Sequence, residues 1–155
     1  MSSLITEKDF LCKGKSGLVY YKDSLYVDCG GNHLPYLGVD KDLLNLLNEI
    51  NGDKAIRITS GYRCNRHNDF SWALYAYETG DTEAIKLYSK HKFGKAADFI
   101  VNGYETFANL ENLIGKFKQE YNEKFWFKVY NVNEGRDFDN KHIFPYVHVQ
   151  KRDIK

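Results

Sequence analysis

Apolar residues change their spacing in a regular order from Lys41 to the end of the chain. Leucines between Lys41 and Asn51 recur with the spacing of an amphipathic helix, with Asp40 as its cap and Gly52 as its stop. Strand-like segments and two more helical segments then follow in alternation. This mixture of the two periods predicts an α+β fold, a small largely antiparallel sheet flanked by helices.

The elements predicted after the first helix are short. Isoleucines alternate with a charged residue in one segment, which is typical of a strand, and β-branched residues end another. A helix is predicted where Trp72 and Tyr75 point inward, and a second where apolar residues recur three or four apart. In chain order the elements are a strand at 55–59, a helix at 69–78, strands at 96–101, 125–132 and 144–150, and a helix at 105–121 before the last two strands.

The length of 155 residues predicts one domain, residues 1–155, with 1–35 as a loop-rich N-terminal extension of it. Met1 to Phe10 lacks the basic start and the apolar stretch of a secretory signal, so we expect no signal peptide and synthesis in the cytoplasm. No apolar run approaches the ~20 residues that a membrane-spanning helix needs, so we expect no membrane insertion. We also expect a monomer.

Charge and cysteine content exclude several classes. The net charge is +1 and the basic residues are interleaved with acidic ones, which is not the pattern of a nucleic-acid-binding surface. Cys12, Cys29 and Cys64 are odd in number and show no C-x-x-C spacing. The sequence therefore predicts reduced structural thiols rather than a disulfide framework or a thiolate zinc cluster.

The segment 89–98 carries the most informative chemistry. It places His91 and Asp98 at the two ends of a loop that enters a predicted strand. A catalytic zinc typically takes three protein ligands, imidazoles or a carboxylate, and keeps a fourth position open. His148 is the candidate third ligand, because alternation along the last strand places Tyr146, His148 and Gln150 on one face. The sequence therefore predicts a Zn²⁺ site made by His91, Asp98 and His148.

Three motifs in this order resemble a known family. They are Ser60-Gly61-Tyr62-Arg63 followed by Asn68, the Ser-x-His-x-x-Gly-x-Ala-x-Asp pattern of 89–98, and Val147-His148-Val149. The chain from about Lys41 onward resembles the zinc D-alanyl-D-alanine carboxypeptidases and phage endolysin peptidases, which share the Hedgehog/DD-peptidase fold. The resemblance implies a zinc metallopeptidase that hydrolyses an amide bond in peptidoglycan stem or cross-link peptides.

The resemblance also implies roles for residues around the metal. Arg63 matches an arginine that contacts a substrate carboxylate or carbonyl, and a planar guanidinium suits either group. Ser89 is expected to orient substrate or a metal ligand. Tyr146 and Gln150 are further candidates for substrate binding, and Gly94 allows a tight turn between the two ligands of the loop.

One position departs from the family pattern. Many members carry an acidic general base three residues before the last histidine, where this chain has Pro145. A substitute base must come from elsewhere, and the charged segment before the strand offers Glu134, Asp137, Asp139 and His142. Asp139 and His142 are predicted as the catalytic pair because they are nearest the strand.

Two other functions compete with the peptidase. The chain is alternatively a zinc-stabilised, inactive module that binds peptidoglycan or a protein, as the loss of the usual base permits. A histidine-based nuclease is the weaker alternative, because no basic groove supports it. His33 and His67 are interpreted as solvated or structural imidazoles. A peptidase of this kind acts on the cell wall after release or phage-mediated delivery.

Overall fold

A four-stranded sheet forms the centre of the computed structural model, which describes residues 4–80, 89–132, 134 and 143–153. Its strands lie in the order β3 (Ile56–Ser60), β4 (Ala96–Val101), β6 (Tyr146–Lys151) and β5 (Phe125–Tyr130). Every neighbouring pair is antiparallel. The predicted α+β class with a small antiparallel sheet is confirmed. None of the helices in the described ranges is both long and apolar enough to span a bilayer.

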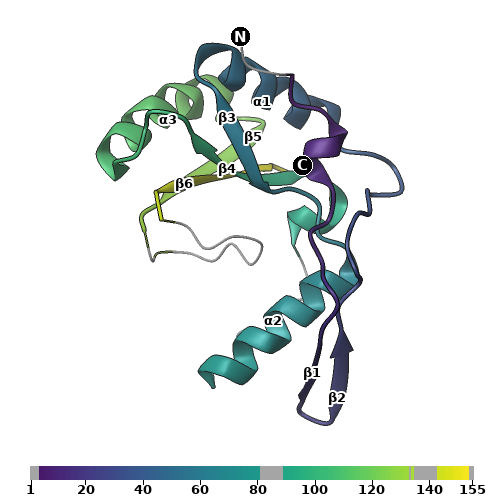
Figure 1. Cartoon of the computed structure of the whole chain (residues 1–155). Coiled ribbons are helices and arrows are strands. Elements are labelled where there is room, and N and C mark those ends of the chain that lie inside the picture. The colour runs from purple at the N-terminus through teal and green to yellow at the C-terminus, as the bar shows by residue number, and fades with distance from the viewer. Residues whose placement is uncertain (1–3, 81–88, 133, 135–142, 154–155) are drawn as a thin grey trace.

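Two helices cover one face of this sheet, above it in Figure 1. Helix α1 (Lys41–Asp53) is capped by Asp40, whose carboxylate accepts the Leu43 amide at 3.0 Å, and α3 (Phe107–Tyr121) is capped by Thr106. Their apolar faces pack on alternate residues of the strands, which places the core between helices and sheet. The core includes Leu43, Leu46, Leu47, Ile50, Leu110, Ile114, Phe99, Phe127, Val147 and Val149.

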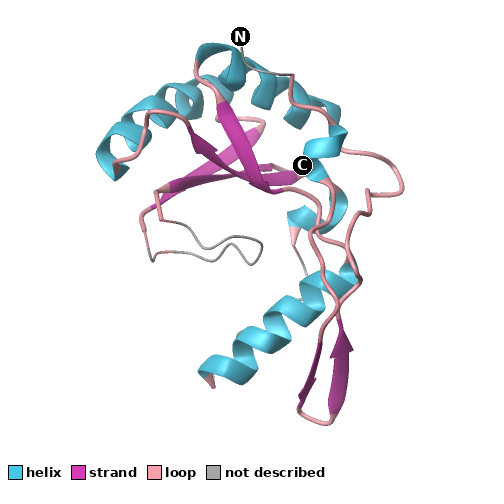
Figure 2. Ribbon diagram, viewed as in Figure 1, coloured by secondary structure: helices cyan, strands magenta, loops and turns pink. Residues whose placement is uncertain are grey.

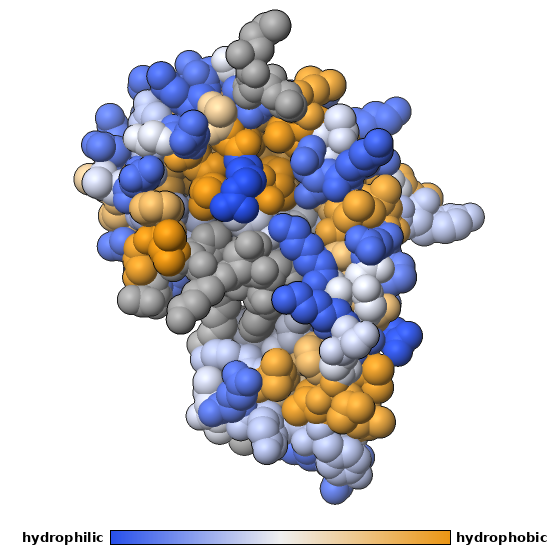
Figure 3. All heavy atoms as spheres, in the orientation of Figure 1, coloured by the Kyte–Doolittle hydropathy of each residue, from blue (hydrophilic) through white to orange (hydrophobic). Residues whose placement is uncertain are grey.

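A hairpin and a third helix lie below the sheet in Figure 1. A hairpin of β1 (Leu18–Tyr21) and β2 (Ser24–Val27) packs against α2 (Asn65–Thr79). Two 3₁₀ turns, η1 (Glu7–Phe10) and η2 (Lys90–Phe93), complete the fold. Figure 2 shows that loops make up most of the chain before α1, as predicted. Apolar side chains gather on the surface over the hairpin in Figure 3, and Leu18, Leu25 and Val27 are exposed there.

Helix α2 begins earlier than predicted. It starts at Asn65, after Cys64 as its N-cap, rather than at Asp69. The first turn is polar, so no apolar periodicity announces it. Trp72 and Tyr75 are only half-buried, because α2 presents its small residues Ala73 and Ala76 to the fold instead.

The N-terminal segment contributes more to the core than the sequence suggested. Phe10 is fully buried and belongs to the main core cluster. The three cysteines are free thiols, as predicted. Their sulfurs nevertheless lie within 4.8 Å of one another, and the absence of a thiolate zinc cluster stays a prediction. Spacing along the chain did not show this proximity, because the three cysteines lie in loops that are far apart in the sequence.

We expect Gly61→Ala to destabilise the fold by about 1–3 kcal/mol, the cost of overpacking a closed site. A Cβ at Gly61 would lie 2.6 Å from the Phe10 Cα and 2.8 Å from its Cδ2, and backbone cannot move aside as a side-chain tip can. Urea unfolding of the chelator-treated protein measures the change.

Gly115→Ala is the matched control. A Cβ at Gly115 of α3 meets nothing within 4 Å. Alanine is the better helix residue, so this variant should be more stable by about 0.5–1 kcal/mol. Equal stabilities of the two variants would contradict the close approach of Gly61 to Phe10.

Candidate metal centre

The register of the central strands brings two of the predicted ligands together. Asp98 of β4 is paired directly with His148 of β6. Directly opposite residues of an antiparallel pair point to the same face and lie close together. Their neighbours Ala97, Phe99, Val147 and Val149 point into the core, so Asp98 and His148 point to the face away from α1 and α3.

His91 reaches the same face from the loop that precedes β4. Ser89 caps the η2 turn, and Gly94 ends it with a left-handed φ of 67°. A Cβ at Gly94 would lie 2.9 Å from the Pro35 ring, so the predicted tight turn needs glycine for space as well as for conformation. His91 is buried, and its Nδ1 lies 2.6 Å from the Gly61 carbonyl oxygen. A carbonyl only accepts, so Nδ1 donates, which leaves Nε2 as the ring nitrogen that is able to bind a metal.

The donor atoms of the three residues converge. His91 Nε2 lies 3.6 Å, and His148 Nδ1 2.7 Å, from the same Asp98 Oδ1. Ligands held about 2.0–2.2 Å from a tetrahedral zinc lie about 3.3–3.6 Å apart. The shorter separation is a hydrogen bond that binding of a cation would replace.

The outer nitrogens of both imidazoles are held by other groups. Gly61 binds His91, and the Gln150 Oε1 lies 2.9 Å from His148 Nε2. Such outer partners fix the ring orientation and the tautomer of metal-ligating histidines. Two oriented imidazoles and one buried carboxylate form a donor set that zinc prefers. The residues therefore fit the predicted Zn²⁺ ion.

The electrostatics of the site favour charged groups despite burial. Burial opposes ionisation of Asp98, but His91 and the hydrogen bond from His148 outweigh it and hold the pKa of this carboxyl well below its usual range. Burial likewise opposes protonation of His148, yet its hydrogen bond to Asp98 raises the pKa of the imidazole. The proton of the hydrogen bond between His148 and Asp98 therefore occupies the position in which a metal cation would bind both residues.

Arg63 lies beside the three candidate ligands. It is buried, its amide donates to the His91 carbonyl at 3.1 Å, and its Nη2 donates to Ser89 Oγ at 3.2 Å. Burial and the positive charge of Arg63 both act to lower the pKa of His148, against the hydrogen bond to Asp98 that raises it. Ser89 also accepts the His91 amide at 3.3 Å. The structure thus brings both residues next to the candidate ligands, with Ser89 touching Arg63 and His91.

The two other predicted contact residues have different surroundings. Gln150 is half-buried and holds His148 as described above. Tyr146 is only 3% exposed, and its ring stacks on Tyr130 with centroids 5.1 Å apart. The structure therefore places Gln150 at the site and packs Tyr146 into the sheet, where little of its surface is open to a substrate.

Two aromatic residues of β5 that were not predicted as site residues lie near the candidate ligands. The ring of Trp126 lies 5.8 Å from the His148 ring, edge to face. Burial raises the pKa of Tyr130, and the nearby charges of Asp98 and Glu134 raise it further. Trp126 pairs with Gln150 across the strands, and Tyr130 pairs with Tyr146. Both therefore lie on the face of the sheet that carries Asp98 and His148. Alternation along β5 was the available signal, but the register with β6 was needed to use it.

The general base is only partly covered by the structure. Asp139, His142 and Asp137 lie outside the described residues, and their roles stay predictions. Glu134 is described and exposed, and its charge acts on Tyr130. Pro145 is buried at the start of β6.

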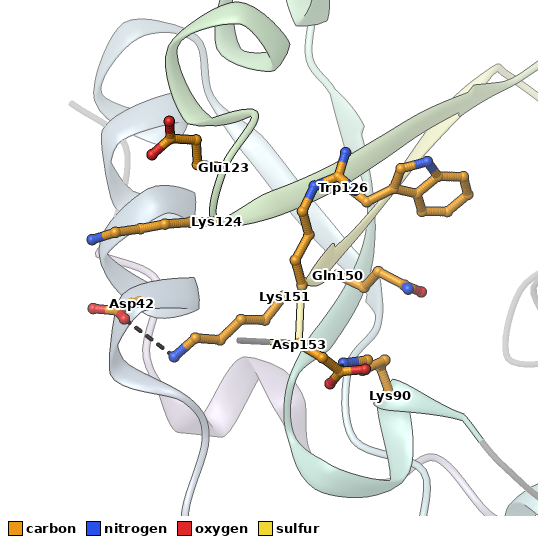
Figure 4. Close-up of a pocket in the computed structure, with 9 residues that line it drawn as sticks. Asp42, Lys90, Glu123, Lys124, Trp126, Gln150, Lys151 and Asp153 are labelled. Carbon is orange, nitrogen blue, oxygen red and sulfur yellow. Dashed lines mark hydrogen bonds and ion pairs between the residues drawn. The ribbon is translucent and has the colours of Figure 1, made fainter. Parts of the chain in front are cut away.

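A surface pocket adjoins the metal site. It shares Trp126 and Gln150 with the site and is otherwise lined by charged residues, as Figure 4 shows. Lys90 pairs there with Asp153, and Lys151 donates to Asp42 at 3.1 Å. The candidate ligands themselves do not line it.

Comparison with known proteins found a weak structural likeness and no match in sequence. No family model matches the chain, and no curated protein matches it in sequence. Among solved structures, it is similar to an L-Ala D-Glu endopeptidase from Serratia marcescens, at 16% identity and a TM-score of 0.42. That match covers 75% of this chain and 82% of the other. A likeness of this size transfers no activity to this chain.

We expect Asp98→Asn to make His148 titrate at a lower pH in metal-free protein. The substitution removes the charge that stabilises the imidazolium, so burial of the ring then dominates. Histidine resonances followed by NMR through a pH series measure the change. The exposed His33 ring serves as an internal reference. An unchanged midpoint for His148 would contradict the pairing of these two residues.

Proposed function

We propose that this chain is a zinc-dependent metallopeptidase that hydrolyses an amide bond in peptidoglycan stem or cross-link peptides. The convergence of His91, Asp98 and His148 on one face of the sheet supports the metal chemistry most strongly. The substrate class is supported by the order and spacing of the three motifs that contain Arg63, Asp98 and His148. Because such a substrate lies outside the membrane, the proposal includes release or phage-mediated delivery of the chain.

Two of the proposed ligands are positioned by strands and the third by a loop. Asp98 and His148 are fixed by neighbouring central strands, and His91 is fixed by a loop that bonds to the Gly61 carbonyl. When bound there, zinc supplies Lewis-acid chemistry that polarises a carbonyl oxygen and makes a water acidic near neutral pH. Holding the ligands before substrate arrives means that no reorganisation is needed during the reaction.

Arg63 is proposed to bind the substrate. Its guanidinium is buried and already held by Ser89, so its remaining donors have a fixed direction. A buried guanidinium binds a carboxylate, or the oxyanion that develops at a peptide carbonyl, more strongly than one in water does. Tyr130 supports the same step, because its raised pKa keeps the phenol protonated and able to donate.

The proton acceptor is proposed to come from the segment before β6. Asp139 and His142 remain the candidates that the sequence favours. Glu134, another candidate from the same segment, is supported by its charge, which helps to raise the pKa of the buried Tyr130. A general base has to approach the reacting water to about 3 Å, directly or through a second water.

The proposal is tested by digestion of purified peptidoglycan and of a synthetic stem peptide. We expect zinc-loaded protein to release peptide fragments, chelator to stop the release, and added zinc to restore it. Mass spectrometry of the products identifies the bond. His91→Ala and Asp98→Asn should each abolish cleavage and lower bound zinc, whereas Glu105→Gln, at an exposed carboxylate remote from the site, should change neither. Intact substrate in the presence of stoichiometric zinc would rule the peptidase out.

A second set of variants identifies the base. Glu134→Gln, Asp139→Asn and His142→Asn each remove one candidate without touching the proposed ligands. Loss of the true base should lower kcat by about 10²–10⁴-fold and leave zinc content unchanged. Three variants with wild-type kcat would exclude all three residues and leave Asp137 or a residue outside this segment as the base.

Pro145 favours one alternative function, a zinc-stabilised module that binds peptidoglycan or a protein without cutting it. Proline accepts no proton, and here it is buried at the position where the resembled family carries its base. Such a module should sediment with insoluble cell wall in the digestion experiment and release no fragments. Release of fragments in a chelator-sensitive manner excludes it.

A further inference from the structure

A second group of potential metal ligands lies apart from the histidine site. It consists of the sulfurs of Cys12, Cys29 and Cys64, all within 4.8 Å of one another. Cys12 follows η1, Cys29 follows β2, and Cys64 precedes α2. Three segments that are far apart in the chain therefore meet at their thiols.

The separation of the sulfurs distinguishes between two uses of such a cluster. Cys12 Sγ and Cys29 Sγ are 3.7 Å apart. A disulfide needs about 2.0 Å, whereas two thiolates held about 2.3 Å from a tetrahedral zinc lie about 3.8 Å apart. The third sulfur also has no role in a disulfide between the other two. The spacing matches shared ligation of one soft cation.

Cys64 occupies a helix position that cysteine does not usually take. It is the N-cap of α2, and its sulfur accepts the His67 amide at 3.5 Å. Serine, threonine, aspartate and asparagine are the residues that favour this position, and cysteine is not among them. A helix N-terminus stabilises the negative charge of a thiolate, which is the form that binds metal.

The other two sulfurs also receive backbone donors. Cys29 Sγ accepts the Gly31 amide at 3.3 Å, in a turn where Gly30 and Gly31 both have positive φ. Burial raises the pKa of the Cys12 thiol to about 12, and the backbone N–H groups of Cys64 and Gly14 act against this increase. A Cβ at Gly14 would lie 2.3 Å from Cys29 Sγ, so glycine makes room for the sulfur there. Each sulfur is thus approached by N–H groups, the arrangement that supports thiolate ligands.

We propose that Cys12, Cys29 and Cys64 bind a structural zinc ion, with His33 as the fourth ligand. The backbone carbonyl of His33 accepts the Cys12 amide at 2.9 Å, and its ring Nε2 lies 3.4 Å from the Cys29 carbonyl oxygen. The backbone of His33 is thus next to Cys12 and its ring is next to Cys29. Three thiolates and one imidazole are a common ligand set of closed structural zinc sites.

This second site supports the first through four consecutive residues. Gly61 holds His91 by its carbonyl, Arg63 reaches Ser89, and Cys64 belongs to the thiol cluster. Tyr62 between them donates its amide to Phe10 at 2.9 Å. A metal at the cysteines therefore fixes the loop that orients one ligand and the candidate substrate arginine of the other site.

Metal content tests the proposal without reference to hydrolysis. Full-length protein with both His91→Ala and Asp98→Asn should retain one zinc per chain by elemental analysis. Its cobalt-substituted form should show thiolate-to-cobalt charge-transfer absorption, which imidazole and carboxylate ligands do not produce. Addition of Cys64→Ser to this variant should remove both the zinc and the absorption. Serine keeps a good helix cap, so α2 should remain folded by circular dichroism.

Two further measurements test the proposed cysteine site. The cobalt spectrum of the unmodified protein should already contain the thiolate absorption, and this needs no variant to fold. His33→Ala should weaken zinc retention against a competing chelator by at least about tenfold. Absence of the thiolate absorption in the unmodified protein, or a Cys12–Cys29 disulfide found by mass spectrometry in place of metal, would overturn the proposal. Unchanged retention in His33→Ala would overturn the assignment of His33.

Discussion

The pairing of Asp98 with His148 across β4 and β6 is the constraint on which the site depends. One residue of slip in this register would turn one partner toward the apolar core and leave its charge unpaired there. The burial of Val147 and Val149 therefore fixes the direction of His148, and the burial of Ala97 and Phe99 fixes that of Asp98. The packing that stabilises the sheet also sets the spacing of the candidate metal ligands.

The loop from Gly61 to Cys64 connects otherwise separate parts of the molecule. It follows β3 directly, contacts Phe10 of the N-terminal segment, and orients both His91 and Arg63. Close approach to Phe10 explains why position 61 is a glycine, since no side chain fits between the two backbones. The N-terminal residues, which the motifs do not include, thereby take part in positioning the site.

Sequence reasoning predicted the order of helices and strands well, because the apolar periods of α1, α3 and the strands are strong. It also selected His91, Asp98 and His148 correctly as residues that meet in space. It did not find the cysteine cluster, because proximity there is created by loops whose conformations depend on glycines and not on any period. Tyr130 and Trp126 were missed for a related reason: alternation shows which residues share a face of a strand, but not which strand lies next to it. The start of α2 at Asn65 was missed because its first turn is polar.

The position of β6 within the sheet has a consequence for the growing polypeptide. This strand is the last described element of the chain, yet it lies between β4 and β5 rather than at an edge. Until it leaves the ribosome, β4 and β5 each present an unpaired edge, and an unpaired edge invites association with other chains. Neither the four-stranded sheet nor the His91, Asp98 and His148 constellation is complete before β6 is synthesised. A product that ended before β6 would therefore lack His148 and would have an open sheet between β4 and β5.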